Sequence, residues 1–126
     1  MTTLQLPPIT ADAMTAEASF ADATIAVVYS GTADTETRPL LEEFVKQLHA
    51  EAVRLSAATV KIDFRELEFM NSSCFKIFVA WLAQLRDLTP EKQYKIQIRS
   101  NPNLLWQRRS LAALSCFAVD LVTIET

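Results

Sequence analysis

Glycine is almost missing from this 126-residue chain, in which Gly31 is the single one. Phosphate-binding loops of the Walker or dinucleotide type need several glycines, so both are excluded. The chain also has only one histidine, His49, and two cysteines, Cys74 and Cys116, which make no metal-ligand pattern. We therefore expect neither a metal site nor a cofactor.

Basic residues are missing from the first part of the chain, where Arg38 is the first Lys or Arg. No basic segment typical of a signal or transit peptide is therefore present. The longest uninterrupted apolar run, residues 77–83, is far shorter than the about 20 residues that span a bilayer. A net charge of −3 argues against nucleic acid as a partner. We expect a cytoplasmic protein with reduced thiols and without nucleic-acid or membrane partners.

The composition is that of a globular protein, since 50% of the residues are hydrophobic and 21% are charged. Residues 1–12, rich in Thr, Pro and Ala, are predicted to be a loose leader, and residues 13–126 a single domain. Strands are predicted at 13–20 (an edge strand), 24–29, 59–64, 94–99 and 119–124, and helices from Thr37 to Leu55 and at 72–88 and 104–114. The alternation predicts an α/β fold with a mixed, largely parallel sheet of about four to five strands, covered by helices mainly on one face.

Apolar spacing predicts which helix faces are buried. The first helix has a stripe formed by Leu41, Phe44, Val45, Leu48, Ala52 and Leu55, and His49 lies off this stripe, as a solvated residue would. The second helix has one formed by Cys74, Phe78, Trp81, Leu82 and Leu85. Ile77 and Val79 lie at the two edges of this second stripe. We expect them to be exposed apolar residues, which often mark an interface.

A short polar run, Asn71-Ser72-Ser73, stands where a strand-to-helix loop ends and the second helix begins. The free N–H groups and the dipole of a helix N-terminus favour an anion. A hydroxyl group at this point is either a helix cap or a site to which phosphate is added. Asn71 is itself a good N-cap, which frees Ser72 from that role.

Three segments resemble the STAS family, which includes the anti-sigma-factor antagonists. The first is a strand that closes in Gly31 and is followed by Asp34 and a helix. The second runs from the strand at 62–64 through Phe69-Met70-Asn71-Ser72-Ser73-Cys74, where the family has an apolar pair and Asp-Ser-Ser/Thr-Gly. The third is Leu114-Ser115-Cys116-Phe117, where the family often has Leu-Ser-Gly-Leu. Asn71 replaces the usual Asp, and each cysteine replaces a usual Gly.

The Asn71-Ser72-Ser73 run, followed by Lys76, is also similar to the Asn-Thr-Ser-Ser-x-Lys loop of a related branch. That branch has a STAS-like fold and regulates diguanylate cyclases through a phosphorylated threonine. Both resemblances imply that Ser72 is the phosphoacceptor, with Ser73 as the second choice. Asn71 and Lys76 would then support the loop and the phosphate.

The resemblance implies a non-enzymatic bacterial signalling module that works by partner switching. Its partners would be a protein kinase that is also an anti-sigma factor, or a related switch protein, and a phosphatase; a homodimer is left open. The partner surface is expected on the second helix, at Cys74, Phe75, Ile77 and Val79.

Two alternatives belong to other classes of protein. The first is a constitutive scaffold or oligomerisation module that is never phosphorylated and in which the polar run is only a cap. The second is an enzyme, with Ser73 in the Ser-x-x-Lys spacing of acylating hydrolases or with Cys74 as a thiol of lowered pKa at a helix N-terminus. This chain lacks the other motifs of acylating hydrolases. A redox role for Cys74 stays open.

Overall fold

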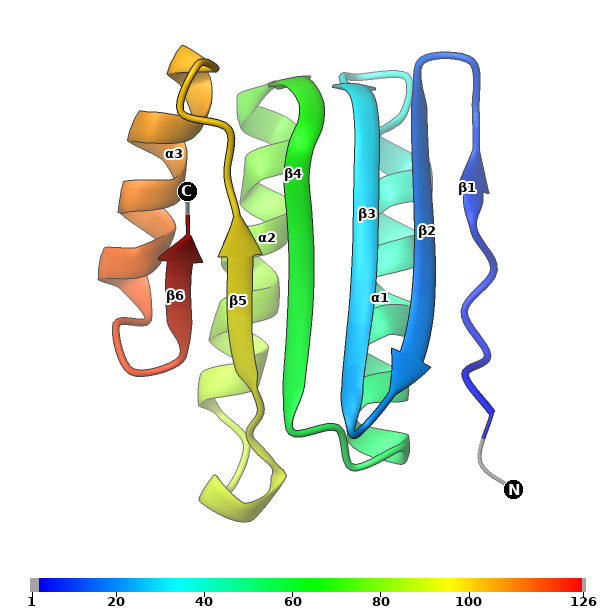
Figure 1. Cartoon of the computed structure of the whole chain (residues 1–126), viewed down its shortest axis with the longest axis vertical. Helices are drawn as coiled ribbons and strands as arrows, with labels where there is room; N and C mark the ends of the chain where they lie inside the picture. Colours follow the sequence, from blue (N-terminus) through cyan, green and yellow to red (C-terminus); the bar gives the residue numbers. More distant parts are fainter. Residues whose placement is uncertain (1–2, 126) are drawn as a thin grey trace.

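The computed structural model describes residues 3–125. A six-stranded sheet carries the fold, and its strands lie side by side in chain order (Figure 1). They are β1 (Ile9–Thr10), β2 (Met14–Ala21), β3 (Thr24–Ala33), β4 (Thr59–Met70), β5 (Lys95–Arg99) and β6 (Val122–Glu125). The first three strands pair antiparallel and the last four pair parallel. The predicted mixed, largely parallel sheet is therefore confirmed, with one strand more than expected.

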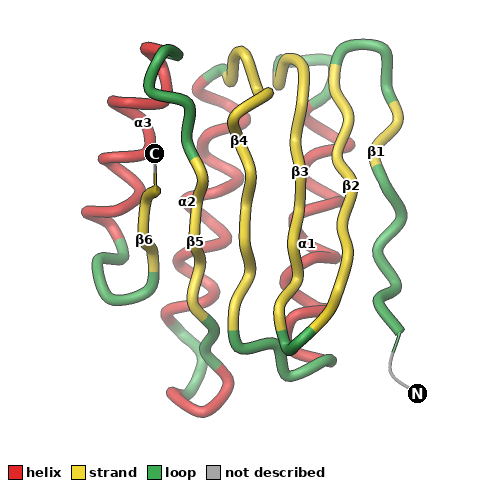
Figure 2. The backbone as a smooth tube through the Cα atoms, viewed as in Figure 1, coloured by secondary structure: helices red, strands yellow, loops and turns green. Residues whose placement is uncertain are grey.

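Three helices, α1 (Arg38–Arg54), α2 (Ser72–Arg86) and α3 (Leu105–Phe117), connect the parallel strands. A single 3₁₀ turn, Pro90–Lys92, lies between α2 and β5. All three helices cover the same face of the sheet, which leaves the other face open (Figure 2). Side chains of the strands accordingly alternate between buried and more exposed positions, as in β5. The predicted α/β architecture, with helices on one face, is thus confirmed.

The core lies between the sheet and the three helices, where the predicted apolar stripes are found. All six stripe residues of the first helix segment and all five of the second are buried. Tyr29 of β3 stands at the centre of an aromatic cluster, with ring centroids 5.8 Å from Phe44, 5.4 Å from Phe64 and 6.0 Å from Phe78. Helices α1 and α2 are thereby fixed over the middle of the sheet.

The expected leader differs from what the structure shows for residues 3–12. Ile9 pairs with Ala16 and is buried, so β1 covers the edge at which β2 was predicted to lie. Closer to the N-terminus, the backbone N–H of Gln5 donates to the Glu51 carboxylate, and Arg54 donates to the carbonyl oxygen of Thr3. This segment is packed along α1.

His49 was expected to be solvated and is half-buried instead. Its Nδ1 lies 2.7 Å from the hydroxyl oxygen of Tyr94, which also accepts a hydrogen bond from Nε1 of Trp81 at 2.6 Å. The three side chains come from α1, from the residue just before β5 and from α2. Burial lowers the pKa of His49, because the charged imidazolium loses hydration.

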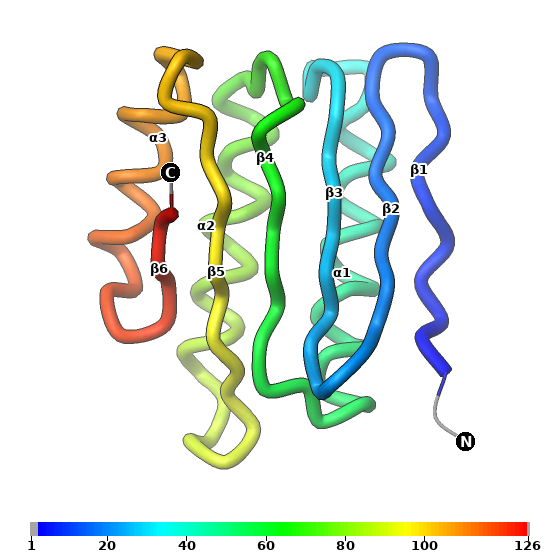
Figure 3. The backbone as a smooth tube through the Cα atoms, in the orientation of Figure 1, coloured from blue at the N-terminus to red at the C-terminus, as the bar shows by residue number. Residues whose placement is uncertain are grey.

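Strand β4 is longer than the predicted 59–64 and reaches Met70. Its second half pairs with the second half of β3, as in the pair Gly31–Leu67, with irregular register on both sides of Gly31. Gly31 has φ +95°, and a Cβ there would lie 2.1 Å from the carbonyl oxygen of Ala13. Only glycine fits this close approach. Because β4 ends at Met70 and α2 begins at Ser72, the loop between them is Asn71 alone. The end of β4 lies beside the end of β3 (Figure 3).

Candidate functional site

Asn71 joins β4 to α2 and is the N-cap of α2. Its Oδ1 accepts a hydrogen bond from the backbone N–H of Cys74 at 2.9 Å. Its own N–H donates to the carbonyl oxygen of Ala33 at the end of β3, and its Nδ2 donates to Oγ1 of Thr35 at 3.4 Å. The start of α2 is therefore tied to β3 and to the loop before α1.

Ser72 and Ser73 occupy the first two positions of α2, and both are exposed. Within residues 3–125, neither hydroxyl makes a hydrogen bond, because Asn71 already provides the cap. The first turn of α2 has no acidic residue that would repel an anion. The hydroxyl of Ser72 is thus accessible beside helix N–H groups that favour negative charge.

Lys76 and Val79 continue the outer face of α2 that begins at Ser72, since residues four and seven positions apart share a helix face. Lys76 is exposed and Val79 is half-buried. Phe75 is also half-buried and packs against the core with one side. These three side chains are therefore available at the surface next to Ser72.

Two residues expected at the partner surface are not exposed. Ile77 is only 7% exposed and lies with Val45 and Trp81 in the seam between α1 and α2. The expectation that Ile77 is an exposed apolar residue is therefore wrong: the apolar stripe of α2 is widened on the side that packs on α1. Cys74 is 0% exposed, so its place on the partner surface is also corrected.

Cys74 faces the loop before α1. Its Sγ lies 3.4 Å from the carbonyl oxygen of Asp34 and donates to it. Burial raises the pKa of the thiol, and the nearby Arg38 opposes this only in part. A raised pKa disfavours the thiolate that redox or nucleophilic chemistry needs. The arrangement at Cys74 thus supports packing and not reactivity.

Phe69 is an exposed apolar residue near the site, and the sequence did not predict a surface role for it. Its side chain is 48% exposed, although its neighbour Met70 is buried. Phe69 pairs with Thr32 and stands two positions before Asn71. The irregular register of β4 could have been suspected from Leu67 and Met70, which are spaced by three and not by two. Phe69 therefore adds exposed apolar surface beside Ser72.

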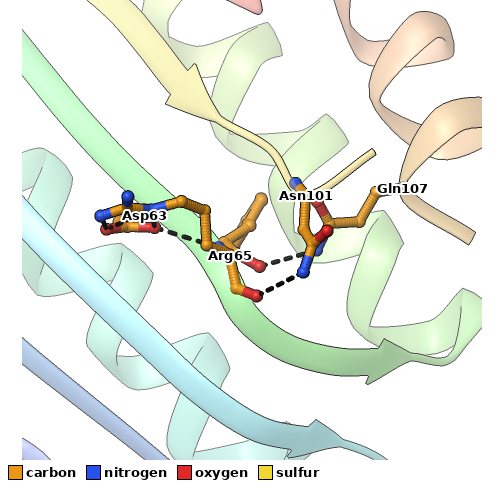
Figure 4. A network of polar contacts seen from close by, with 5 residues as sticks. Asp63, Arg65, Asn101 and Gln107 are labelled. Carbon is orange, nitrogen blue, oxygen red and sulfur yellow. Dashed lines mark hydrogen bonds and ion pairs between the residues drawn. The ribbon is translucent and has the colours of Figure 1, made fainter. Parts of the chain in front are cut away.

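The outer edge of β4 is covered by α3 and not by a strand near this site. Gln107, only 1% exposed, donates from Nε2 to the carbonyl oxygen of Phe64 at 2.6 Å, and Asn101 donates to that of Arg65 at 3.1 Å (Figure 4). Gln107 is therefore buried and Trp106 half-buried where α3 meets β4.

Among the described residues no cluster of His, Cys, Asp or Glu could hold a metal ion. Within the same part of the chain, no helix is long and apolar enough to cross a membrane.

The chain is similar to solved structures of anti-sigma factor antagonists. One from Mycobacterium paratuberculosis has a TM-score of 0.62 and 23% identity, over 85% of this chain and 84% of that one. The antagonist SpoIIAA, in its unphosphorylated form, has a TM-score of 0.60 and 14% identity, over 88% of each chain. No protein-family profile matches the sequence, and no curated protein matches it either. The structural likeness shows that the chain has the STAS fold.

Proposed function

We propose that this chain is a non-enzymatic signalling module that binds a protein partner beside Ser72 and is switched by phosphorylation of Ser72. The observation that carries this proposal is the division of roles at the start of α2. Asn71 caps the helix, and the exposed hydroxyl of Ser72 has no structural role within residues 3–125. The likeness to anti-sigma factor antagonists, one of them solved in an unphosphorylated form, supports the same function.

The partner in this proposal is an anti-sigma factor with kinase activity or a related switch protein, and a phosphatase restores the unmodified form. The contact surface is the outer face of α2 with the end of β4, at Ser72, Phe69, Phe75 and Val79. Ile77 and Cys74 do not belong to it, because they are buried. Asn71 shapes the loop, and Lys76 stands one turn after Ser72 on the same face.

Phosphorylation would add about −1.5 to −2 charges at Ser72. The helix dipole stabilises such a charge by about 0.3–1 kcal/mol, and Lys76 can pair with it. The fold should therefore tolerate the phosphate. A partner that covers Phe69 and Val79 would have to remove water from the phosphate as well, which opposes binding. The switch thus acts on the interface and leaves the domain folded.

The test begins with the protein isolated from its native host. Its intact mass shows whether a phosphate is present, and the masses of its peptides show whether the phosphate is on the loop that contains Ser72. Lysate of that host is then passed over immobilised wild type, Ser72→Ala, Ser72→Glu and the matched control Ser73→Ala. We expect phosphate on Ser72, and a protein that wild type, Ser72→Ala and Ser73→Ala retain but Ser72→Glu loses. Equal recovery on all four, with no phosphate on the native protein, would leave a constitutive scaffold as the function.

A further inference from the structure

Strand β4 continues past its neighbour β5. The last pair between them is Asp63–Arg99, after which the chain leaves the sheet towards α3. Beyond this pair, no strand among residues 3–125 borders β4 on its β5 side. An uncovered strand edge leaves backbone groups without partners, which is costly where they are buried.

Side chains from α3 and from the turn before it take the place of the missing strand (Figure 4). Besides its bond to Phe64, Gln107 Nε2 donates to the carbonyl oxygen of Leu67 at 3.2 Å, and Trp106 Nε1 donates to the same oxygen at 3.3 Å. Asn101 Nδ2 donates to the carbonyl oxygen of Arg65. The carbonyl groups of Phe64, Arg65 and Leu67 are thus satisfied from α3 and the turn before it.

The amide of Gln107 is itself fixed from the other side. Its Oε1 accepts a hydrogen bond from the backbone N–H of Asn101 at 2.7 Å. With two bonds donated by Nε2 and one accepted by Oε1, both ends of this buried amide have partners. A glutamate at position 107 could not donate at neutral pH, and a methionine would fill the space without any hydrogen bond.

The hydrogen bonds from Gln107, Trp106 and Asn101 to β4 hold the segment that leads into the Ser72 site. Leu67 lies four residues before Asn71, whose N–H bonds to Ala33 of β3 on the opposite side. The end of β4 is therefore held between β3 and α3. We infer that Gln107 is a positioning residue: by clamping the carbonyl groups of Phe64 and Leu67, it fixes where Asn71 and Ser72 are presented. The consequence of this positioning for a partner rests on the proposed function.

The experiment measures amide hydrogen exchange by NMR in the full chain, without a partner. The reporters are the amides of Asn71 and Cys74, which are hydrogen-bonded to Ala33 and to the Asn71 side chain. Gln107→Met should increase the exchange rate at both reporters at least about tenfold, because the end of β4 loses its hydrogen bonds to α3 and opens locally more often. This increase is counted after subtracting the part that the measured loss of global stability explains, since local opening and global unfolding contribute separately to exchange.

The matched control is Leu114→Ala, which removes a buried α3 side chain that lies by Ile62 and Phe64 of β4 but makes no hydrogen bond to their carbonyl groups. It should lower global stability, and the exchange rates of the two reporter amides should rise by no more than that loss of stability explains. Trp106→Phe is the second variant in case Gln107→Met does not fold. It keeps an aromatic ring beside Phe64, removes the Nε1 donor together with part of the indole ring, and should give a smaller rise at the same reporters.

The exchange rates of the reporters are compared among the variants after correction for differences in global stability. If they are no faster in Gln107→Met and Trp106→Phe than in Leu114→Ala, Gln107 is not a positioning residue. The proposed function is decided separately, by phosphate on Ser72 and by the recovery of a partner. An absent phosphate and an unaffected recovery would reject that function, while the exchange rates would still decide the role of Gln107.

Discussion

The side-chain oxygen of Asn71 accepts the backbone N–H of Cys74 at 2.9 Å, and this bond closes the first turn of α2. Asn71→Ala removes the bond and leaves the N–H without a side-chain acceptor. We expect the free energy of unfolding to fall by about 1 kcal/mol, the usual effect of losing an N-cap. Urea denaturation followed by circular dichroism measures it.

Ser72→Ala is the matched control for this cap. Because the Ser72 hydroxyl is exposed and makes no hydrogen bond within residues 3–125, the free energy of unfolding should change by no more than about 0.5 kcal/mol. A loss as large as that of Asn71→Ala would show that Ser72 caps the helix. The cap would then explain the polar run without any phosphorylation.

Ile77 should behave as a core residue. Ile77→Ala removes methyl groups that pack in the seam between α1 and α2, and we expect a loss of about 2 kcal/mol, near the low end for buried aliphatic truncations. Val79→Ala, on the half-buried side of the same helix, should lose clearly less. Thermal or urea denaturation of both variants compares them. If both variants lose the same small free energy of unfolding, Ile77 lies at the surface of α2 and not in the core.

The hydroxyl of Tyr29 is buried and has no hydrogen-bond partner in the described part of the chain. Burial accordingly raises the pKa of Tyr29 strongly. Tyr29→Phe keeps the ring packing and removes the desolvated hydroxyl, so we expect the free energy of unfolding to rise by about 1 kcal/mol. The urea midpoint reports the change, and a loss of similar size would mean that the hydroxyl is satisfied in solution.

The parts of the fold that the sequence predicted well are those with local periodicity. Leu41, Phe44 and Leu48 follow the helical repeat, and Ile96 and Ile98 follow the strand repeat, so the elements and their buried faces were predicted correctly. The position of Asn71 and Ser72 at the start of a helix was predicted in the same way, because they stand at a strand-to-helix junction. Helix capping is a local interaction that a short segment determines.

The parts that were missed depend on partners far along the chain. Strand β1 exists because Ile9 meets Ala16 and because the residues before it are bound to α1. Ile77 is buried because α1 packs beside α2. Gln107 is buried because β5 ends before β4 does. No local pattern contains these relationships, since each depends on how two distant segments meet.

The half-buried His49 should make stability depend on pH. Tyr94 accepts from Trp81 and can donate its own hydrogen to His49 Nδ1, so the neutral imidazole fits the site. The pKa of folded His49 lies below its ordinary value of 6.5. The stabilisation is therefore present above pH 6.5 and is lost as the pH falls from 6.5 through the folded pKa.

This pH dependence is isolated by comparison with His49→Gln, which does not titrate. We expect the difference in urea midpoint between wild type and His49→Gln to shrink as the pH falls from about 7.5 to 5. Carboxylate titration affects both proteins alike and cancels in the difference. A difference that stays constant over this range would show that His49 titrates alike in the folded and unfolded chains.

Lys76 should stabilise phosphorylated Ser72 and have little effect on the unmodified protein. The two residues are one helical turn apart on the exposed face of α2, where an opposite-charge pair contributes about 0.2–0.5 kcal/mol. Protein with phosphoserine incorporated at position 72 and unmodified protein are each compared with and without Lys76→Ala, which makes a double-mutant cycle. The coupling should decrease at high salt, because exposed charges are screened.

Lys46→Ala, at an exposed lysine of α1, is the matched control and should show no coupling. A coupling at Lys76 no larger than at Lys46 would mean that the phosphate is held by the helix N-terminus alone.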